Sequence, residues 1–216
     1  MKRLKTAGAC KWMRLAVTIG FESRLVIRAV ARLPPADDYI FLRARTGREG
    51  DRNSADVAAD VIKALGRGRD YAVDISDLAK GLEELAGLDF DAVALAGGPR
   101  ALILLTFIAA SLKGVKIYVL PEYAPDPIEA TALSKVFHLT CLSPAKLRVL
   151  AEADGPADEV ARRLGLDTTT VYRHLEALAE RGLIVSEGSR RKIYRSEDVV
   201  KVLAQLVLKH FTNKKG

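Results

Sequence analysis

Residues 183–195 read Leu183-Ile-Val-Ser-Glu-Gly-Ser-Arg-Arg-Lys-Ile-Tyr-Arg195, and they directly follow Thr168-Thr-Thr-Val-Tyr-Arg-His-Leu-Glu-Ala-Leu-Ala-Glu-Arg181. In the earlier stretch, Val171, Leu175 and Leu178 recur at the spacing of one helix face. The later stretch has two short β-prone runs around a basic tip, which is typical of a hairpin. A helix that begins with small hydroxyl side chains and continues into a basic hairpin predicts a winged helix-turn-helix.

The segments on either side complete such a domain. Ser143 and Pro144 are a capping residue and a first-turn proline, and they predict a helix that continues to Ala153. A second helix is predicted at 156–164, and a final one at about 197–211. The final helix carries an apolar stripe of Val199, Val200, Leu203, Leu206 and Val207. This stripe either joins a dimer interface or packs against its own domain.

The predicted third helix and the hairpin supply candidate DNA contacts. Hydroxyls and an arginine near the start of such a helix can meet base edges and phosphates, and a basic hairpin tip can clamp the DNA backbone. The candidates are Thr168, Thr169, Thr170, Tyr172, Arg173 and His174 on the helix, and Arg190, Arg191 and Lys192 on the hairpin. The alternative interpretation is a solvated basic hairpin on a small interaction domain.

The first two-thirds of the chain alternates short apolar runs with segments of helical spacing. Strands are predicted at 14–19, 39–42, 70–74, 91–95, 116–120 and 132–139, and helices at 22–33, 51–65, 76–85 and 100–112. Ser76 is the expected cap of the third of these helices. Strand and helix alternate four times, which predicts a Rossmann-like, mostly parallel sheet with helices on both faces.

Two glycine-containing turns are expected at the carboxyl edge of this sheet, where such folds bind ligands. They are Gly20-Phe-Glu-Ser-Arg24, after the first strand, and Gly97-Gly-Pro-Arg100, after the fourth. In the common strand order these two strands are neighbours. Backbone N–H groups at a helix start, together with Ser23, Arg24 and Arg100, can hold a phosphate. The turns lack the glycine pattern of a dinucleotide site and the Gly-Lys-Ser/Thr of a nucleotide triphosphatase.

Composition narrows the class of protein. The formal net charge of +7 favours polyanionic partners. Two cysteines and three histidines are too few for a disulfide framework or a zinc site, so we expect no metal. Because the glycine pattern of a dinucleotide site is missing, we also expect no cofactor. No apolar run approaches the ~18 residues of a membrane span, and no apolar core follows the basic N-terminus. We therefore expect a cytoplasmic protein without a membrane partner.

The segment Thr18-Ile-Gly-Phe-Glu-Ser-Arg-Leu-Val-Ile-Arg28, the turn Gly97-Gly-Pro-Arg100 and a following winged helix together resemble the CRISPR-associated Rossmann-fold (CARF) transcription regulators of archaea. The recognition helix, Thr170-Val-Tyr-Arg-His-Leu175, is similar to that of winged-helix regulators. The resemblance implies a homodimer whose sensor domains bind cyclic oligoadenylate, most often the tetramer, across the two-fold axis.

Carried over by position, the resemblance implies one set of ligand-binding residues. They are Gly20, Phe21, Glu22, Ser23 and Arg24 in the first turn, and Gly97, Gly98, Pro99 and Arg100 in the second. Pro99 departs from the family pattern, which has a donor-bearing residue there. Some relatives cleave the cyclic ligand without a metal, and Ser23 and Arg100 are the candidate catalytic residues for such a ring nuclease.

We therefore expect an extension at 1–12, a CARF sensor domain at 13–139, a linker at 140–142 and a winged helix-turn-helix domain at 143–216. The expected function is homodimeric regulation of CRISPR-associated genes in antiviral defence, with cyclic tetra-adenylate as ligand and a near-palindromic promoter as DNA partner. The alternatives are a ring nuclease, or a regulator that senses another anionic metabolite.

Overall fold

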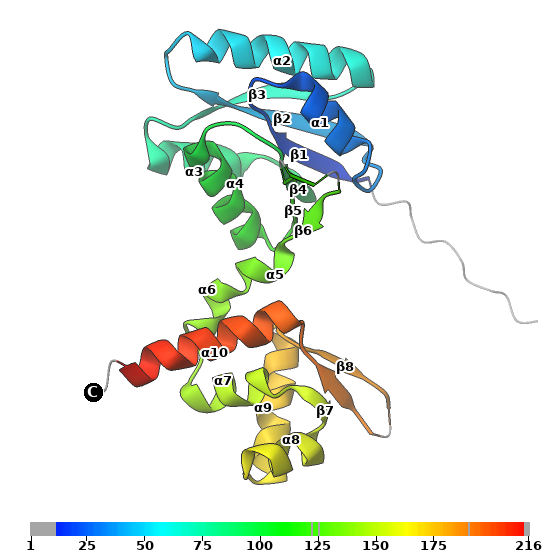
Figure 1. The fold of residues 1–216 in the computed structure, drawn as a ribbon, viewed down its shortest axis with the longest axis vertical. Helices are drawn as coiled ribbons and strands as arrows, with labels where there is room; N and C mark the ends of the chain where they lie inside the picture. Colours follow the sequence, from blue (N-terminus) through cyan, green and yellow to red (C-terminus); the bar gives the residue numbers. More distant parts are fainter. Residues whose placement is uncertain (1–11, 122, 125, 190, 214–216) are drawn as a thin grey trace, which may run out of the picture. The chain divides into compact units, whose positions relative to one another are not determined.

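The computed structural model describes residues 12–121, 123–124, 126–189 and 191–213 (Figure 1). The chain divides into two compact units between Thr131 and Ala132, eight residues before the end that we placed at residue 139 for the sensor domain. Each unit has its own apolar core. The α/β fold class is confirmed, with a Rossmann-like sheet in the first unit and a winged helix-turn-helix in the second.

The first unit alternates strands and helices. Its elements are β1 (Arg14–Thr18), α1 (Ser23–Val30), β2 (Asp38–Arg45), α2 (Gly50–Leu65), β3 (Arg69–Asp74), α3 (Leu78–Gly87), β4 (Ala92–Leu95), α4 (Arg100–Lys113), β5 (Lys116–Val119) and β6 (Ile128–Glu129). The strand order is β3-β2-β1-β4-β5-β6, and only the short β6 is antiparallel to its neighbour. β1 and β4 therefore lie side by side, as expected, and strand order reverses between them.

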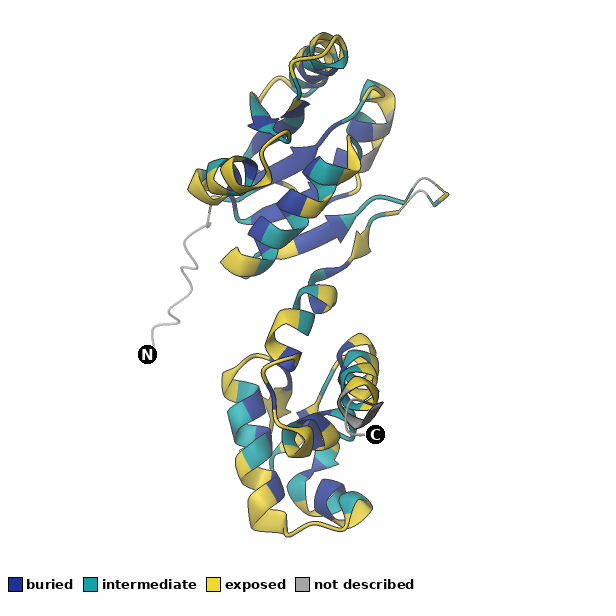
Figure 2. Cartoon of the chain, turned by 90° about the vertical axis from the view of Figure 1, so that its left-hand side faces the viewer, coloured by how far each residue is buried: buried dark blue, intermediate teal, exposed yellow. Residues whose placement is uncertain are grey.

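Helices cover both faces of this sheet, because every second residue of a buried strand points to the same face. On one face, Leu15 and Val17 of β1 pack with buried residues of α1 and α2. On the other face, Ala16 packs with buried residues of α3 and α4. In Figure 2 the central strands of the sheet are dark blue and the outer sides of the helices are largely yellow, which is the burial pattern of a parallel sheet with helices on both faces.

The second unit is a three-stranded sheet with helices packed against it. The remaining elements of the chain are α5 (Thr131–Ser134), α6 (Val136–Leu139), α7 (Pro144–Ala151), β7 (Asp154–Pro156), α8 (Ala157–Leu164), α9 (Thr168–Glu180), β8 (Val185–Glu187), β9 (Ile193–Arg195) and α10 (Asp198–Asn213). β8 and β9 form the predicted hairpin, and β7 pairs with the other side of β9. Ser143 caps α7 by accepting from the Lys146 N–H, and Pro144 occupies its first turn, as predicted.

Three predictions of local structure are wrong. Residues 132–139 are not a strand, because Ala132 and Leu139 are buried in the core of the second unit from two short helices, α5 and α6. The cap of α3 is Asp77, which accepts from two backbone N–H groups, whereas the Ser76 hydroxyl donates to Asp74. β2 does not end at residue 42, because pairing with β3 extends it to Arg45.

None of the described helices combines the length and the apolar character that crossing a membrane requires.

Candidate functional sites

The two predicted turns meet at the carboxyl edge of the sheet, backbone against backbone. A Cβ atom placed on Gly20 would lie 2.9 Å from the Gly98 nitrogen, and one placed on Gly98 would lie 2.7 Å from the Ile19 carbonyl oxygen. Gly98 also has a φ of 104°, in the region that favours glycine. Both positions therefore require glycine, because any side chain would force the turns apart.

A buried hydroxyl, which the sequence analysis did not single out, joins the same two turns. Thr18, the fully buried last residue of β1, accepts from the backbone N–H groups of Ala96 at 3.0 Å and Gly97 at 3.4 Å. These N–H groups follow the end of β4 and would otherwise be unpaired. The sequence does contain a signal for this role, since Thr18 is the only hydroxyl side chain in an otherwise apolar strand end.

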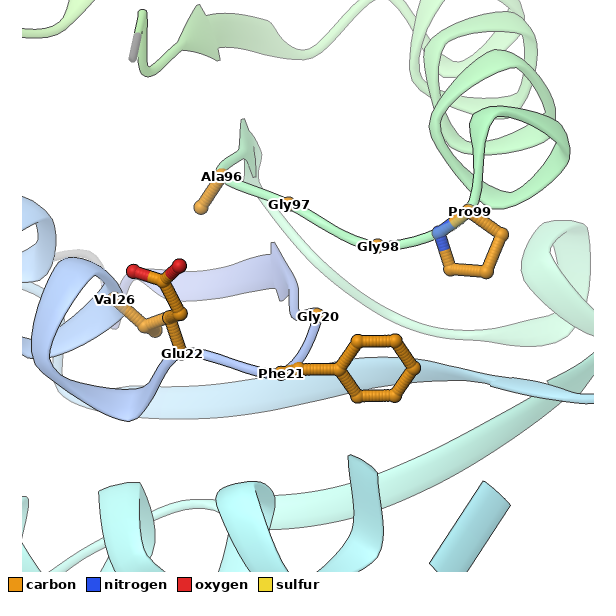
Figure 3. Close-up of a pocket in the computed structure, with 8 residues that line it drawn as sticks. All are labelled: Gly20, Phe21, Glu22, Val26, Ala96, Gly97, Gly98 and Pro99. Carbon is orange, nitrogen blue, oxygen red and sulfur yellow. The ribbon is translucent and has the colours of Figure 1, made fainter. Parts of the chain in front are cut away.

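The turns enclose a pocket of about 560 Å³, shown in Figure 3. Its lining residues are Gly20, Phe21, Glu22, Val26, Ala96, Gly97, Gly98 and Pro99. Six of the nine predicted ligand-binding residues are thus brought together, and Val26 and Ala96 join them. The other three, Ser23, Arg24 and Arg100, do not line the pocket.

The polar character of this pocket comes mainly from the backbone. Within the described part of the chain, the N–H groups of Gly20, Phe21 and Gly98 donate to no acceptor. The exposed side chains of Arg24 and Arg100 make no ion pair with any described residue. N–H groups and unpaired guanidinium groups at helix starts suit an anion. The Glu22 carboxylate points toward the second turn in Figure 3, and it is the acidic group among the lining residues.

A second, smaller pocket of about 190 Å³ shares Gly20, Phe21 and Pro99 with the first. Its further walls come from the end of β2 and the start of α2, where the sequence predicted no site residue. Asp51 organises this region by accepting from the Thr46 N–H, the Thr46 hydroxyl and the Gly47 N–H at 2.7–2.8 Å. The hydrogen bond from the Thr46 hydroxyl, followed by that from its N–H, lowers the pKa of Asp51.

In the second unit, α9 presents most of its predicted DNA-contacting residues to solvent. Thr168, Thr169, Thr170, Tyr172 and Arg173 are exposed, and His174 is half-buried. Asp167 caps the helix by accepting from the Thr170 N–H at 2.9 Å, and this hydrogen bond lowers the pKa of Asp167. Val171, Leu175 and Leu178 lie on the opposite, fully buried face.

The hairpin cations, by contrast, are already paired with carboxylates. Lys192 donates to Glu176 on α9 at 2.8 Å, and Arg191 donates to both Asp158 and Glu159 at the start of α8. The hydrogen bond to Glu176 raises the pKa of Lys192 and the same bond lowers that of Glu176. Arg190 lies outside the described residues. Acidic side chains of α8 and α9 therefore hold both of the described hairpin cations.

Glu176 also fixes the buried side of the hairpin. It accepts from the hydroxyl of Tyr194, which is fully buried in β9, so one carboxylate ties α9 to the hairpin through two side chains. Burial, reinforced by this hydrogen bond, raises the pKa of Tyr194. Glu176 is half-buried and links the helix to the hairpin within the domain.

The final helix has two apolar faces, and the structure assigns one of them to the core of its own unit. Val200 and Ala204 are fully buried in the core of the second unit, with Leu203 and Val207 packed against it. Val199, Val202 and Leu206 remain 44–55% exposed, at the spacing of one helix face. In the first unit, Leu104 and Leu112 are similarly exposed on α4.

Among the described residues, no group of three His, Cys, Asp or Glu side chains is arranged to hold a metal ion.

Comparisons with known proteins match both units. Residues 13–130 match the Csa3 CRISPR-associated Rossmann-like domain, and residues 147–188 match the IclR helix-turn-helix domain. The CRISPR locus-related protein Csa3 of Thermoproteus tenax is 43% identical over 197 residues, which are 90% of this chain and 97% of that protein.

Solved structures are similar at a lower level. Can2 of Sulfobacillus thermosulfidooxidans, solved with cyclic tetra-adenylate, is 11% identical with a TM-score of 0.42, and the match covers 93% of this chain and 64% of that one. A MarR-family transcriptional regulator from Rhodococcus is 23% identical with a TM-score of 0.31 over 39% of this chain and 67% of that one. By the match over most of its length, the chain belongs to the Csa3 family of CRISPR-associated proteins, which confirms the resemblance to CARF winged-helix regulators.

Proposed function

We propose that this protein is a homodimeric transcription regulator of CRISPR-associated genes that binds a cyclic oligoadenylate in its Rossmann-like unit and promoter DNA through its winged helix. The role in regulating CRISPR-associated genes is supported by the relative from Thermoproteus tenax, which is a CRISPR locus-related protein. The helix-turn-helix match at 147–188 and the exposed start of α9 support the DNA partner.

The observation that carries the ligand proposal is the contact between the two turns at Gly20 and Gly98. Two adjacent turns with unpaired N–H groups form a concave, electropositive backbone surface suited to phosphate. Arg24 and Arg100 would supply mobile cations at its margin, because neither is held by an ion pair with a described residue. A cyclic ligand carries several phosphates, so two copies of this surface related by symmetry could hold one ring.

A dimer is supported by the unpartnered apolar surface on both units. Leu104 and Leu112 on α4, and Val202 and Leu206 on α10, are 52–74% exposed. Exposed apolar side chains that cluster on one helix face are typical of association surfaces. A two-fold dimer would place its two recognition helices about 34 Å apart or at a multiple of that spacing, which suits a near-palindromic site.

The test is a calorimetric screen of cyclic oligoadenylates, with and without the DNA upstream of the gene. We expect binding of cyclic tetra-adenylate at one ring per two chains, and a change in its affinity of roughly 5- to 150-fold when DNA is present. The absence of heat with every ring size, while promoter binding persists, would point to a regulator that senses another metabolite. A stoichiometry of one ring per single chain would contradict a binding site shared by two chains.

A further inference from the structure

Four side chains of the second unit form a cluster between the recognition helix and the hairpin, here called the Glu176 cluster. Its members are Tyr172 and Glu176 on α9, Lys192 directly before β9, and Tyr194 within β9. The two helix residues are four positions apart and therefore lie on one side of α9. The two hairpin residues are two positions apart and therefore point to one side of the extended chain. The cluster thus consists of two pairs that meet across the domain.

The Glu176 carboxylate lies at the centre of the cluster. Its two oxygens accept from the Lys192 ammonium at 2.8 and 3.0 Å, and one of them also accepts from the Tyr194 hydroxyl at 2.5 Å. If Lys192 moved to a DNA phosphate, this half-buried carboxylate would lose its charge partner, which is unfavourable. The pair therefore favours a role for Lys192 within the domain.

The cluster holds the ring of Tyr172 in place. The centroids of the Tyr172 and Tyr194 rings are 6.4 Å apart with their planes at 80°, and the Lys192 ammonium lies 5.9 Å from the centroid of Tyr172. Both arrangements are attractive, the first between aromatic rings and the second between a cation and a ring. Tyr172 is nevertheless 42% exposed, whereas Tyr194 is fully buried. A ring that is held on one side and exposed on the other loses little conformational freedom when a partner binds it.

The place of Tyr172 on α9 indicates what this partner is. It lies one turn after Thr168, the first residue of the helix, and its neighbour Arg173 is also exposed. The first turns of such a helix contact base edges in the major groove. A tyrosine ring offers apolar surface for a thymine methyl group, and its hydroxyl can donate or accept a hydrogen bond. Contacts of this kind depend on base sequence, whereas a lysine on a phosphate does not.

From this arrangement we infer that Tyr172 is a specificity-determining residue that contacts a base edge in the promoter. Glu176 is a positioning residue: it does not touch DNA, and it holds the Tyr172 ring by fixing Lys192 and Tyr194 beside that ring. The inference rests on the proposed binding of promoter DNA by the winged helix, and it assigns sequence discrimination to one side chain of the recognition helix and to the carboxylate behind it.

The experiment measures discrimination between two duplexes by fluorescence anisotropy with the full-length protein. One duplex is the DNA upstream of the gene, and the other has the same length and composition in scrambled order. The specificity ratio is the affinity for the first divided by that for the second. A change in protein charge acts on the phosphates of both duplexes, so its effect largely cancels in this ratio.

The variants are Tyr172→Ala, Glu176→Gln and the two combined. Glu176→Gln removes the charge that holds Lys192 but keeps the size of the side chain. Glu180→Gln is the matched control, because Glu180 is exposed on the same helix and makes no ion pair with a described residue. Thermal unfolding of each variant verifies that it folds.

Tyr172→Ala and Glu176→Gln should each lower the specificity ratio at least about fivefold, and Glu180→Gln should leave it unchanged. The combined variant should have the same ratio as Tyr172→Ala alone, because Glu176 acts through the tyrosine. The salt dependence of binding to the scrambled duplex should be the same in Glu176→Gln as in the wild type.

A different set of results would overturn the inference. If Glu176→Gln keeps the ratio but steepens the slope of log affinity against log salt concentration by about 0.9, Lys192 is a phosphate contact that the carboxylate restrains. Additive losses in the combined variant would show that Glu176 does not act through Tyr172. An unchanged ratio in Tyr172→Ala would overturn the inference even if Glu176→Gln does not fold, because Tyr172 is exposed.

The wild-type protein separates these failures from failure of the proposed function. If it prefers the upstream duplex, promoter binding stands whatever the variants do. If it binds both duplexes equally, regulation through this promoter fails, and the inference fails with it.

Discussion

The hydroxyl of Thr18 accepts a hydrogen bond from the backbone N–H of Ala96 at 3.0 Å, and this bond joins the ends of two neighbouring parallel strands. Thr18 is fully buried and 78 residues away from Ala96 in sequence. The bond fixes where the second turn starts, and therefore where its glycines meet Gly20. The shape of the proposed anion site thus depends on a side chain that does not line it.

Replacement of Thr18 by valine tests this dependence. The valine keeps the shape but removes the acceptor, so buried N–H groups at Ala96 and Gly97 lose their partner. We expect the free energy of unfolding in urea to fall by about 1–3 kcal/mol. Ligand affinity should fall as well, because the second turn is no longer held. Thr18→Ser retains the hydroxyl and should preserve ligand affinity, and equal ligand binding by the valine variant would contradict the proposed role.

Replacement of Gly98 by alanine tests the contact between the turns. The new Cβ atom would lie 2.7 Å from the Ile19 carbonyl oxygen, at a φ of 104°. Gly114→Ala is a matched control, since Gly114 has a φ of 66° and a Cβ there meets nothing within 4 Å. We expect Gly98→Ala to destabilise the protein by about 1–3 kcal/mol more than the control does, in thermal or urea unfolding. The control should keep its ligand, and Gly98→Ala should lose it.

The alternation of strands and helices, the neighbouring positions of β1 and β4, and the glycine turns between them could be predicted from the sequence. They follow from local apolar periodicity and from a general rule of parallel sheets. The role of Thr18 could not, because it depends on a partner 78 residues away. The smaller pocket was missed for a similar reason, since it forms only when the start of α2 packs near Phe21.

The second unit shows the same limit. Its hairpin and recognition helix were predicted from local pattern, whereas the pairing of β7 with β9 joins segments about 40 residues apart. The basic tip was interpreted as free to clamp phosphates. The sequence does not reveal that Arg191 meets Asp158 and that Lys192 meets Glu176, because charge pairs between elements depend on tertiary packing.

The paired hairpin cations lead to a prediction about DNA affinity. The double variant Asp158→Asn, Glu159→Gln releases Arg191 from two carboxylates without changing the cation itself. Ion pairs in solvent are weak, so promoter DNA should bind only about two- to fivefold more tightly. Fluorescence anisotropy across a salt series measures this. The gain in DNA affinity should vanish when Arg191→Ala is added to the double variant. Arg191→Ala should also reduce the slope of log affinity against log salt concentration by about 0.9.

The variant Glu180→Gln distinguishes a general effect of net charge from the release of Arg191 from its carboxylates. Glu180 is exposed on α9 and makes no ion pair with a described residue. If Glu180→Gln tightens DNA binding as much as a single change at Asp158 or Glu159 does, the carboxylates act through overall charge and do not restrain Arg191.

Asp51 makes the stability of the first unit depend on pH. Hydrogen bonds from Thr46 and Gly47 lower its pKa in the folded protein relative to the unfolded chain. A lowered pKa means that the stabilisation is complete above the unfolded value of about 4 and is lost as pH falls through the folded value. Asp51→Asn should therefore be less stable than the wild type at pH 7. In urea unfolding from pH 7 to pH 2, the difference in free energy of unfolding between the two proteins should shrink as the pH falls. A constant difference would show that the charge of the Asp51 carboxylate does not contribute to stability.

The outer face of α10 should contribute to association of two chains. Val202 and Leu206 are 52% and 55% exposed on a helix whose opposite face is already buried in its own domain, so lysines there should not disturb the core. We expect Val202→Lys with Leu206→Lys to weaken the dimer in sedimentation experiments and leave the unfolding midpoint nearly unchanged. Gln205→Lys adds charge to the same helix without removing apolar surface, and it should remain dimeric. If Gln205→Lys alone weakens association of the two chains, charge and not apolar burial governs this association. An unaffected dimer in the double variant would assign association to another surface, for which Leu104 and Leu112 on α4 are the next candidates.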